Sequence, residues 1–500
     1  MFFSPTASLP DGLRLHTEPF GKAIAELVEM PSDVVKLLLP GVRIDAQQFR
    51  KIGGGQGEPC QVEAPRLGHE ADRGFDGADL ALWPLSLRAD ETYSFDLAEV
   101  EKKPYHLGGY LEAKPLLSHP SVDSALYRLK YRERDLGKSL EEANLKLQLE
   151  GSYEKGMAGL YFKTNTDFKL SRLGDDESTD LFEGYLSLKP SSSWRIDAGK
   201  KTFKWGKGYA WNPVGFIDRP KDPDDPEVGM EGVFALSADY TKSFDGPLKT
   251  VSFTPVLQPV YDHINAEFGK NNYLNAAGKL YLLLYDTDID FLFLTGGSRT
   301  SRFGADFSRN VTTNWEIHGE IAYVKDFRAN LSDPAGKVVP VEYDATSFLL
   351  GTRYLTARDT TYILEYYRNG TGFSGEEMGN FFSFIGNAYR TYVATGNDAA
   401  LQKAALLSEG NYGRPNPLRD YLYLRVSQKE PFDILYVTPA LTTILNLNDR
   451  SFTLSPEVAY TGITNLELRL KASFIRGAVG SEYGEKPFDF KLELRAGYYF

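Results

Sequence analysis

The chain of 500 residues has little sulfur and no long apolar run. Cys60 is the single cysteine and there are only five methionines, so an internal disulfide framework is excluded. No stretch of about 18 consecutive apolar residues occurs, so a membrane-spanning helix is not expected. The formal net charge is −12, which argues against nucleic acid as a partner because its phosphates attract basic surfaces.

Aromatic residues and glycine are abundant instead. The chain contains 30 tyrosines, 31 phenylalanines and 46 glycines, while its mean hydropathy is negative. A membrane β-barrel is hydrophilic on average because half of each strand faces water. The composition therefore favours one large barrel over several soluble domains.

The last thirteen residues, 488–500, alternate without a break between two kinds of side chain. Asp489, Lys491, Glu493 and Arg495 carry charge, and the residues between them are apolar or aromatic. A period of two predicts a strand with one wet and one apolar face. At roughly 3.3 Å per residue it spans about 40 Å, longer than most soluble strands and suited to crossing a membrane.

The same alternation recurs along the chain and predicts eighteen strands. They are expected at 122–133, 143–153, 157–170, 180–189, 194–201, 231–243, 249–261, 276–285, 289–297, 301–309, 314–325, 344–355, 360–369, 419–429, 434–447, 451–462, 464–475 and 488–500.

The connections between these strands alternate in length. Short turns are expected near 154–156, 190–193, 245–247, 286–288, 310–313, 357–359, 430–433 and 462–464. The other connections are mostly longer: 134–142, 171–179, 202–230, 262–275, 326–343, 370–418 and 476–487, with short ones at 298–300 and 448–450.

Short periplasmic turns and long extracellular loops are typical of bacterial outer-membrane barrels, and an even strand count returns both chain ends to the periplasm. We therefore predict an all-β fold, a large antiparallel transmembrane barrel of 18 strands, with 16 as the second choice. A soluble propeller also has alternating strands, but it gives no reason for a one-sided division of loop lengths.

The N-terminal residues do not follow this pattern. Residues 78–87 resemble a damaged signal-sequence core, and we interpret 1–89 as a poorly structured segment produced by a start placed upstream of the true one. A small periplasmic or plug segment is the alternative. Residues 90–121 are expected to form a periplasmic segment, in which 105–113 is either one more strand or a stretch beneath the barrel. The barrel itself is expected over 122–500.

Charged residues on the inward faces predict two walls of opposite sign across a bore. The basic wall comprises Arg128, Lys130, Arg132, Arg425, Lys429, Arg469, Lys471, Lys491 and Arg495, and the acidic wall comprises Asp306, Glu316 and Glu320. Such walls produce a transverse field that filters ions and orients polar solutes. The alternative is that these charges pair with one another and only hydrate the bore.

The connection 202–230 carries the most distinctive motif, in which Gly199-Lys-Lys-Thr-Phe-Lys-Trp-Gly-Lys-Gly-Tyr-Ala-Trp-Asn-Pro leads into a proline-rich acidic stretch. Flat rings and cations suit a sugar or an acidic sugar, so the predicted constriction and solute-binding residues are Lys204, Trp205, Lys207, Tyr209, Trp211 and Arg219. The alternative is that the rings pack this loop against the inner wall. Residues 222–227 lack an ordered calcium-loop pattern, and a solvated acidic turn is favoured.

This motif, Gly-basic followed by Trp-Gly and Asn-Pro, resembles large outer-membrane barrels of the bacterial porin superfamily, especially those grouped with alginate-export and capsule-assembly proteins. The final strand, ending on Phe500, resembles the strand by which the bacterial barrel-assembly machinery recognises its substrates. The resemblance implies a Gram-negative outer membrane, contacts with its lipid and lipopolysaccharide, and either a channel or a polysaccharide-handling surface protein.

We therefore predict an outer-membrane porin for passive or substrate-selective diffusion of small polar or anionic solutes, sugars among them. The alternative is a structural barrel in surface polysaccharide assembly or export, or in a multi-protein conduit. No catalytic residues are predicted: His318 has inward carboxylate neighbours but no Gly-x-Ser-x-Gly motif accompanies it. No metal-ligand spacing or phosphate loop occurs, so neither a metal nor a cofactor is predicted. The long connection 370–418 is expected to be a lid, a plug or a surface-binding loop, with a short helix at 398–409 packed against the mouth.

Overall fold

The structure is a computed structural model that describes residues 103–132 and 134–500. The chain divides into two units, Met1–Lys103 and Pro104–Phe500, and the second is the one described below. The interpretations of residues 1–89 and of Cys60 lie outside the described residues.

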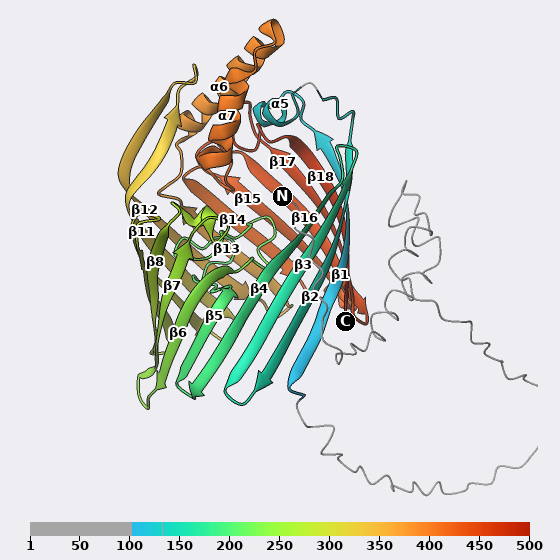
Figure 1. Cartoon of the computed structure of the whole chain (residues 1–500). Helices are drawn as coiled ribbons and strands as arrows, with labels where there is room; N and C mark the ends of the chain where they lie inside the picture. The colour runs from blue at the N-terminus through green and yellow to red at the C-terminus, as the bar shows by residue number, and fades with distance from the viewer. Residues whose placement is uncertain (1–102, 133) are drawn as a thin grey trace, which may run out of the picture. The chain divides into compact units, whose positions relative to one another are not determined.

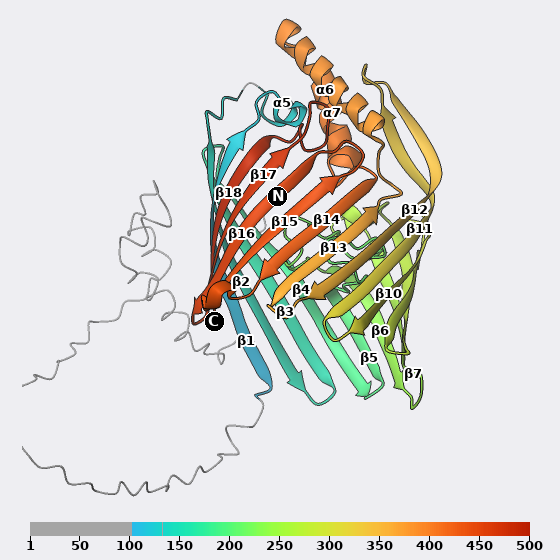
Figure 2. The same ribbon diagram turned by 180° about the vertical axis from the view of Figure 1, so that it is seen from behind.

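Eighteen antiparallel strands form a closed barrel (Figures 1 and 2). Each strand pairs with the next along the chain, and β18 pairs back with β1. The strands are β1 Tyr105–Pro120, β2 Leu140–Lys155, β3 Ala158–Ser171, β4 Asp176–Ser191, β5 Trp194–Lys201, β6 Val233–Ser243, β7 Leu248–Val260, β8 Tyr273–Leu284, β9 Thr287–Thr295, β10 Arg302–Thr312, β11 Trp315–Ser332, β12 Val338–Leu355, β13 Thr360–Arg368, β14 Asp420–Gln428, β15 Val437–Asn446, β16 Phe452–Ile463, β17 Leu466–Arg476 and β18 Phe488–Tyr499. The predicted fold class and strand count are confirmed.

The predicted first strand is wrong. Residues 122–133 contain the helix α5 (Ala125–Tyr131), whereas the first strand is β1, paired with both β2 and β18. The helix begins where the Ser124 hydroxyl accepts a hydrogen bond from the Tyr127 amide at 3.2 Å, which is a standard helix start. The barrel therefore begins at Tyr105, and much of the predicted periplasmic segment 90–121 belongs to the wall.

The two ends of the barrel differ in the length of their connections. Eight turns lie at one end, and the longest of them is 429–436. The opposite end carries the connections 121–139, 202–232 and 369–419 together with six shorter ones. This division matches the predicted one.

The connection predicted at 326–343 is mostly strand. β11 and β12 keep pairing as far as Ser332 and Val338, so a projecting hairpin replaces the expected loop (Figure 1). Phe327 and Tyr343 pack edge to face across this hairpin at 5.6 Å. Cross-strand aromatic pairs of this kind stabilise strand pairing.

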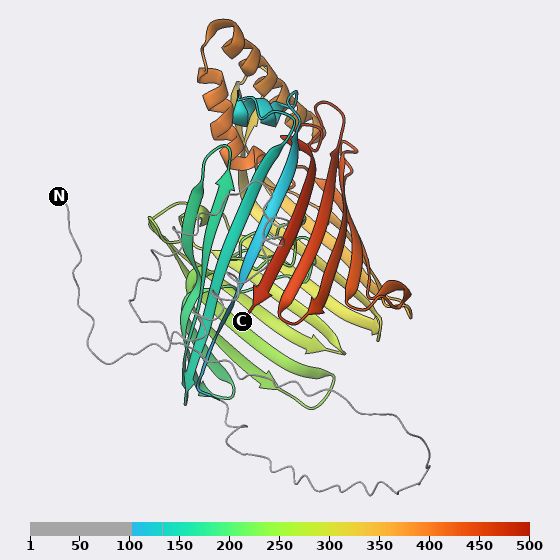
Figure 3. The same ribbon diagram turned by 90° about the vertical axis from the view of Figure 1, so that its right-hand side faces the viewer.

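Helices gather at the long-loop end of the barrel (Figure 3). The connection 369–419 contains α6 (Gly375–Thr395) and α7 (Ala399–Leu407), and only the second was predicted. Ser374 and Glu377 form a reciprocal cap at the start of α6, a sequence signal that identifies a helix start. The described residues also contain three short helical turns: η1 Ala266–Phe268, η2 Ser408–Tyr412 and η3 Pro431–Asp433.

None of the helices in residues 103–500 has both the length and the apolarity needed to cross a membrane. The outer faces of the strands are apolar: Leu350 is 56% exposed, and Ile321 and Leu364 are also exposed, whereas Glu320 on the inward face of β11 is 4% exposed. A continuous apolar exterior of this kind is stable in lipid and not in water.

An arginine on this exterior is expected to destabilise the barrel. We predict that Leu350→Arg lowers the free energy of unfolding in lipid vesicles by about 2–4 kcal/mol if the residue lies near the bilayer centre, measured by urea titration with a gel-mobility readout. The matched control, Leu406→Arg on α7, places the same charge outside the strands at a residue that is 70% exposed, and it is expected to change stability by less than about 0.5 kcal/mol. Equal effects of the two substitutions would contradict a lipid-facing exterior.

Candidate functional site: a loop inside the bore

The connection 202–232, here called the inner loop, lies inside the barrel. It leaves β5 and returns to β6, yet its backbone contacts inward side chains of β11 and β13, and the coil is visible within the bore in Figure 1. Gly206 has a φ of +101°, and a Cβ there would lie 2.7 Å from a carboxylate oxygen of Glu320. Glycine at this position allows the loop to approach the wall closely.

Three carboxylates form a row on the wall that the loop reaches. Asp306 on β10 pairs directly with Asp290 on β9 and with Glu320 on β11, and all three residues are buried. The Lys207 ammonium lies 3.0 Å from Asp290 and 4.0 Å from Asp306. One oxygen of Glu320 accepts hydrogen bonds from the backbone amides of Lys207 and Gly208, each at 2.6 Å. The row therefore binds the first half of the inner loop.

A second carboxylate site continues this attachment. Glu365 on β13 accepts hydrogen bonds from the backbone amides of Tyr209 and Ala210, the latter at 2.9 Å. The His318 Nε2 atom lies 2.8 Å from the same carboxylate. Gly351 on the strand between them leaves room for the imidazole, since a Cβ there would lie 2.0 Å from Nε2.

The inner loop is also held from within. Asp218 accepts hydrogen bonds from the backbone amides of Phe203, Lys204 and Trp205 at 2.9, 3.1 and 2.8 Å. Burial raises the pKa of the Asp218 carboxyl, and these three hydrogen bonds oppose the rise. The loop thus has its own capped turn before it reaches the wall.

The two tryptophans of the loop do not face a solute. Trp205 is 2% exposed and Trp211 is 5% exposed. The Trp211 ring stacks on Tyr367 at 5.1 Å, and its Nε1 donates to Asn416 at 3.1 Å. This burial contradicts the predicted contact of the two tryptophans with a solute. The structure instead has the alternative, in which the rings pack the loop against the inner wall.

The remaining loop residues have varied surroundings. Lys204 is exposed, and the Tyr209 hydroxyl donates to Glu227 at 3.0 Å. Arg219 forms ion pairs with Glu231 at 2.9 Å and Glu267 at 2.7 Å. Of the predicted set, Lys207 and Tyr209 anchor the loop to the rest of the site.

Five residues of the predicted basic wall lie on strands near the end of the chain: Arg425 on β14, Arg469 and Lys471 on β17, and Lys491 and Arg495 on β18. Arg128, Lys130 and Arg132 lie on α5, outside the strands, so their predicted position on the wall is wrong. Arg128 lies over the Tyr389 ring of α6 at 5.3 Å, and Arg132 pairs with Asp398 at 3.0 Å; these arginines attach α5 to the other helices.

Each arginine of the wall already has carboxylate partners. Arg425 lies 3.2 Å from Glu457. Arg469 lies 2.8 Å from Glu467. Arg495 lies 2.6 Å from Asp225 of the inner loop, 3.0 Å from Glu493 and 3.8 Å from Glu112.

The other predicted wall residues also have defined places. The Lys471 ammonium donates to the Asp224 carbonyl at 2.5 Å, so the second half of the inner loop is bound by β17 and β18. Lys429 lies in the turn after β14 rather than on a strand. Glu316 accepts from Ser308 and contacts His318, each at 3.1 Å.

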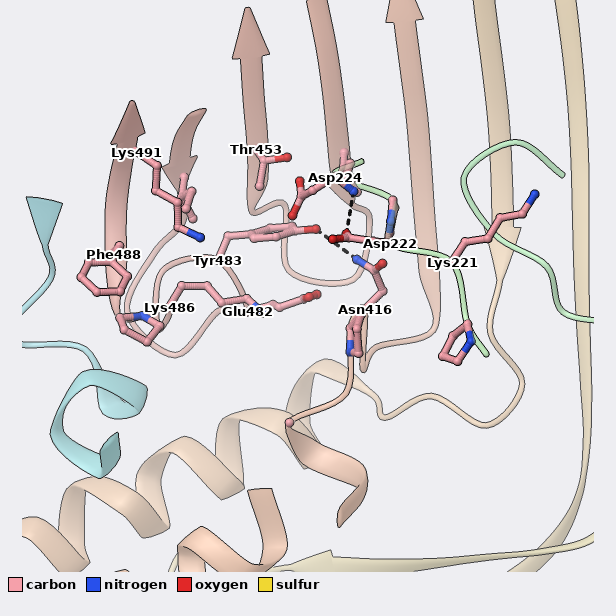
Figure 4. A pocket seen from close by; sticks show the side chains of 17 residues that line it. Lys221, Asp222, Asp224, Asn416, Thr453, Glu482, Tyr483, Lys486, Phe488 and Lys491 are labelled. Atoms are coloured by element: carbon pink, nitrogen blue, oxygen red, sulfur yellow. Dashed lines mark hydrogen bonds between the residues drawn. The ribbon is translucent and has the colours of Figure 1, made fainter. Parts of the chain in front are cut away.

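The inner loop contributes to two cavities. One, of about 340 Å³, lies between residues 220–224 of the loop, the 413–416 segment and the mouth of β15–β18 (Figure 4). The other, of about 830 Å³, is lined by Lys207, Lys279, Tyr281 and several hydroxyl side chains of β4–β8. The loop therefore takes part in the lining on both sides of the place where it crosses the bore.

Several residues of the site were not predicted. Asp290, Glu365 and Glu457 lie at inward positions of predicted strands, so the alternation places them on the inner face. Glu482 and Tyr483 lie in the predicted connection 476–487, where no pattern distinguishes them. Glu320 and Glu365 bind backbone amides because the inner loop passes beside them. The alternation of side chains along the strands does not predict the path of that loop.

No protein-family model matches the chain, and no curated protein matches it. The chain is similar to solved outer-membrane proteins. A triple mutant of the Rhodopseudomonas blastica porin has 10% identity and a TM-score of 0.39, with 79% of this chain and 100% of that chain covered. OccAB1 of Acinetobacter baumannii has 10% identity and a TM-score of 0.45, with 79% and 96% covered. The outer membrane protein OprD of Pseudomonas aeruginosa has 10% identity and a TM-score of 0.45, with 79% and 93% covered.

Loss of a wall carboxylate is expected to loosen the inner loop. We predict that Glu320→Gln costs about 1–3 kcal/mol of local stability, because buried amides lose a charged acceptor. Hydrogen exchange of the amides in 204–214 should then accelerate roughly tenfold or more. Glu342→Gln, which removes an exposed partner of Arg328, is the control and should leave exchange in 204–214 unchanged. Unchanged exchange in both variants would show that Glu320 does not hold the loop.

Proposed function

We propose that this chain is an outer-membrane channel through which small polar solutes diffuse, narrowed by the inner loop. The observation that carries the proposal is a closed barrel of eighteen strands, apolar outside and charged inside, with a connection bound across its bore. Barrels of 16 to 18 strands leave an aqueous channel, and a loop across that channel sets which solutes pass.

The charges of the bore support passage of polar solutes rather than of simple anions. Arg425, Arg469 and Arg495 are each compensated by carboxylates, so the wall has no unpaired arginine to concentrate a small anion. Asp290 and Glu320 on the other side are occupied by the loop. A solute that passes these paired groups meets a field between charges of opposite sign, which orients dipoles.

The proposed setting is the outer membrane of a Gram-negative-type bacterium. The apolar exterior would contact lipid and lipopolysaccharide. Phe500 exchanges two backbone hydrogen bonds with Gly109, both at 3.0 Å, so the last residue is part of the seam that closes the barrel. Recognition of this strand by the barrel-assembly machinery is part of the proposal.

Arginines of the wall and arginines of α5 are expected to differ in their effect on ion selectivity. In planar bilayers, Arg469→Gln with Arg495→Gln should shift the reversal potential towards cations, because Glu467, Glu493 and Asp225 lose their compensation. The triple variant Arg128→Gln, Lys130→Gln, Arg132→Gln should leave the reversal potential unchanged, since these residues lie on the helix outside the strands. A shift in the triple variant and none in the double would contradict the assignment of the wall.

The same bilayer measurement separates a channel from a structural barrel. Steady single-channel openings of the folded wild-type protein are the expected result. A folded barrel that inserts without conducting would overturn the proposal and favour the structural role in surface polysaccharide assembly or export or in a multi-protein conduit. Fractionation of cell envelopes should place the chain in the outer membrane.

A further inference from the structure

Six side chains with a carboxyl or an ammonium group line the cavity of about 340 Å³ shown in Figure 4. Within the part of the chain that the structure describes, none of them has an oppositely charged group within 4.0 Å. Elsewhere in the barrel, charged side chains are commonly paired. The six are three lysines and three carboxyl groups: Lys221, Lys486, Lys491, Asp222, Asp224 and Glu482.

Lys491 and the two aspartates of the cavity come from different elements. Lys221 belongs to the same inner loop as the aspartates, and its ammonium donates to the Gly208 carbonyl. Lys491 extends from β18, whereas Asp222 and Asp224 belong to the inner loop. In Figure 4, Lys491 and Asp224 approach the cavity from different sides, with Tyr483 between them. Lys491 and the two aspartates therefore place opposite charges at different parts of the cavity wall, whereas Lys486 and Glu482 share the connection 477–487.

One buried oxygen of the cavity lacks a partner. Glu482 is 1% exposed, and its Oε2 accepts hydrogen bonds from Tyr421 at 2.6 Å and Asn446 at 2.7 Å. Its Oε1 has no hydrogen-bond partner among the described residues. Burial raises the pKa of this carboxyl, and the Lys486 ammonium and the two hydrogen bonds oppose the rise. Buried polar atoms are normally hydrogen-bonded, so Glu482 retains an unused acceptor atom in a residue that lines the cavity.

We propose that this cavity is a binding site for small dipolar solutes that carry both an ammonium and a carboxylate group. The solute carboxylate would face Lys491 and the solute ammonium would face the loop carboxylates, so that each charge of the solute meets an opposite charge of the cavity that has no ion-pair partner. The rings of Tyr483 and Phe488, which also line the cavity, would contact the carbon atoms of the solute. The proposal rests on the proposed channel function and specifies the solutes that the channel detains.

Other ligand classes fit the cavity less well. The described residues contain no group of three or more acidic, histidine or cysteine side chains arranged to hold a metal ion. A simple anion would leave the aspartates unpaired, and a neutral polyol would leave both signs unpaired. The volume of about 340 Å³ is at the lower end of the range for ligand pockets, which favours a small molecule.

Binding can be measured by calorimetry on the full-length protein in detergent, with L-glutamine as the dipolar probe. Acetate carries the negative charge alone, ethylammonium carries the positive charge alone, and sorbitol carries no charge. We expect L-glutamine to bind at least tenfold more tightly than any of the three. Equal binding of acetate or ethylammonium, or no binding of L-glutamine, would overturn the proposal.

Matched substitutions locate the site. Lys491→Met and Asp224→Asn should each weaken L-glutamine binding tenfold or more. Lys270→Met and Asp262→Asn make the same changes at exposed positions of the 261–272 connection and should alter binding less than twofold. Equal effects of the cavity and control variants would refute the location, and heat-dependent gel mobility verifies that each variant forms a barrel.

Bilayer recordings distinguish failure of this proposal from failure of the channel. L-Glutamine should produce resolved interruptions of the wild-type current, which the Lys491→Met variant should shorten. A conducting protein whose current and calorimetry are both insensitive to L-glutamine would refute the binding site and leave the channel standing. A protein that binds L-glutamine without conducting would refute the channel and retain the site.

Discussion

The arrangement of the bore depends on carboxylates of the wall that accept hydrogen bonds from the backbone of the inner loop. Glu320 and Glu365 take four amides of consecutive residues, 207–210. A backbone segment away from water needs acceptors for its amides, and a carboxylate is a strong one. Since the strands fix both glutamates, the loop position follows from the barrel, and the two cavities follow from the loop position.

The barrel was largely predictable because the alternation of polar and apolar side chains recurs along the chain. Seventeen of the predicted strands overlap observed ones, since alternation is repeated in each strand. The exception is 122–133. The spacing of Tyr127 and Tyr131 also suits one face of a helix, and in the structure both rings are buried against Leu136 and Leu140. The β11–β12 hairpin was read as a loop because Asp326 and the residues around it interrupt the alternation, although pairing resumes beyond them.

The site was less predictable because it depends on contacts between distant parts of the chain. The motif of the inner loop drew attention to the correct segment, but ring chemistry suggested solute contact where Trp211 stacks on Tyr367. Likewise, the charge pattern identified Arg469 and Arg495 on the wall, while their compensation by Asp225 arises from a loop that enters from β5. The local sequence pattern predicts which side chains point into the barrel. It does not predict which residues from distant parts of the chain pair with them.

The seam between β1 and β18 joins residues at opposite ends of the described chain. Contacts between residues so far apart in sequence are slow to form, and no cylinder exists until the final strand is available. Until then β1 and the strand formed most recently are open sheet edges, which invite pairing with other chains. The unclosed sheet therefore needs protection at its edges, and the pairing of β18 with β1 ends this vulnerable period.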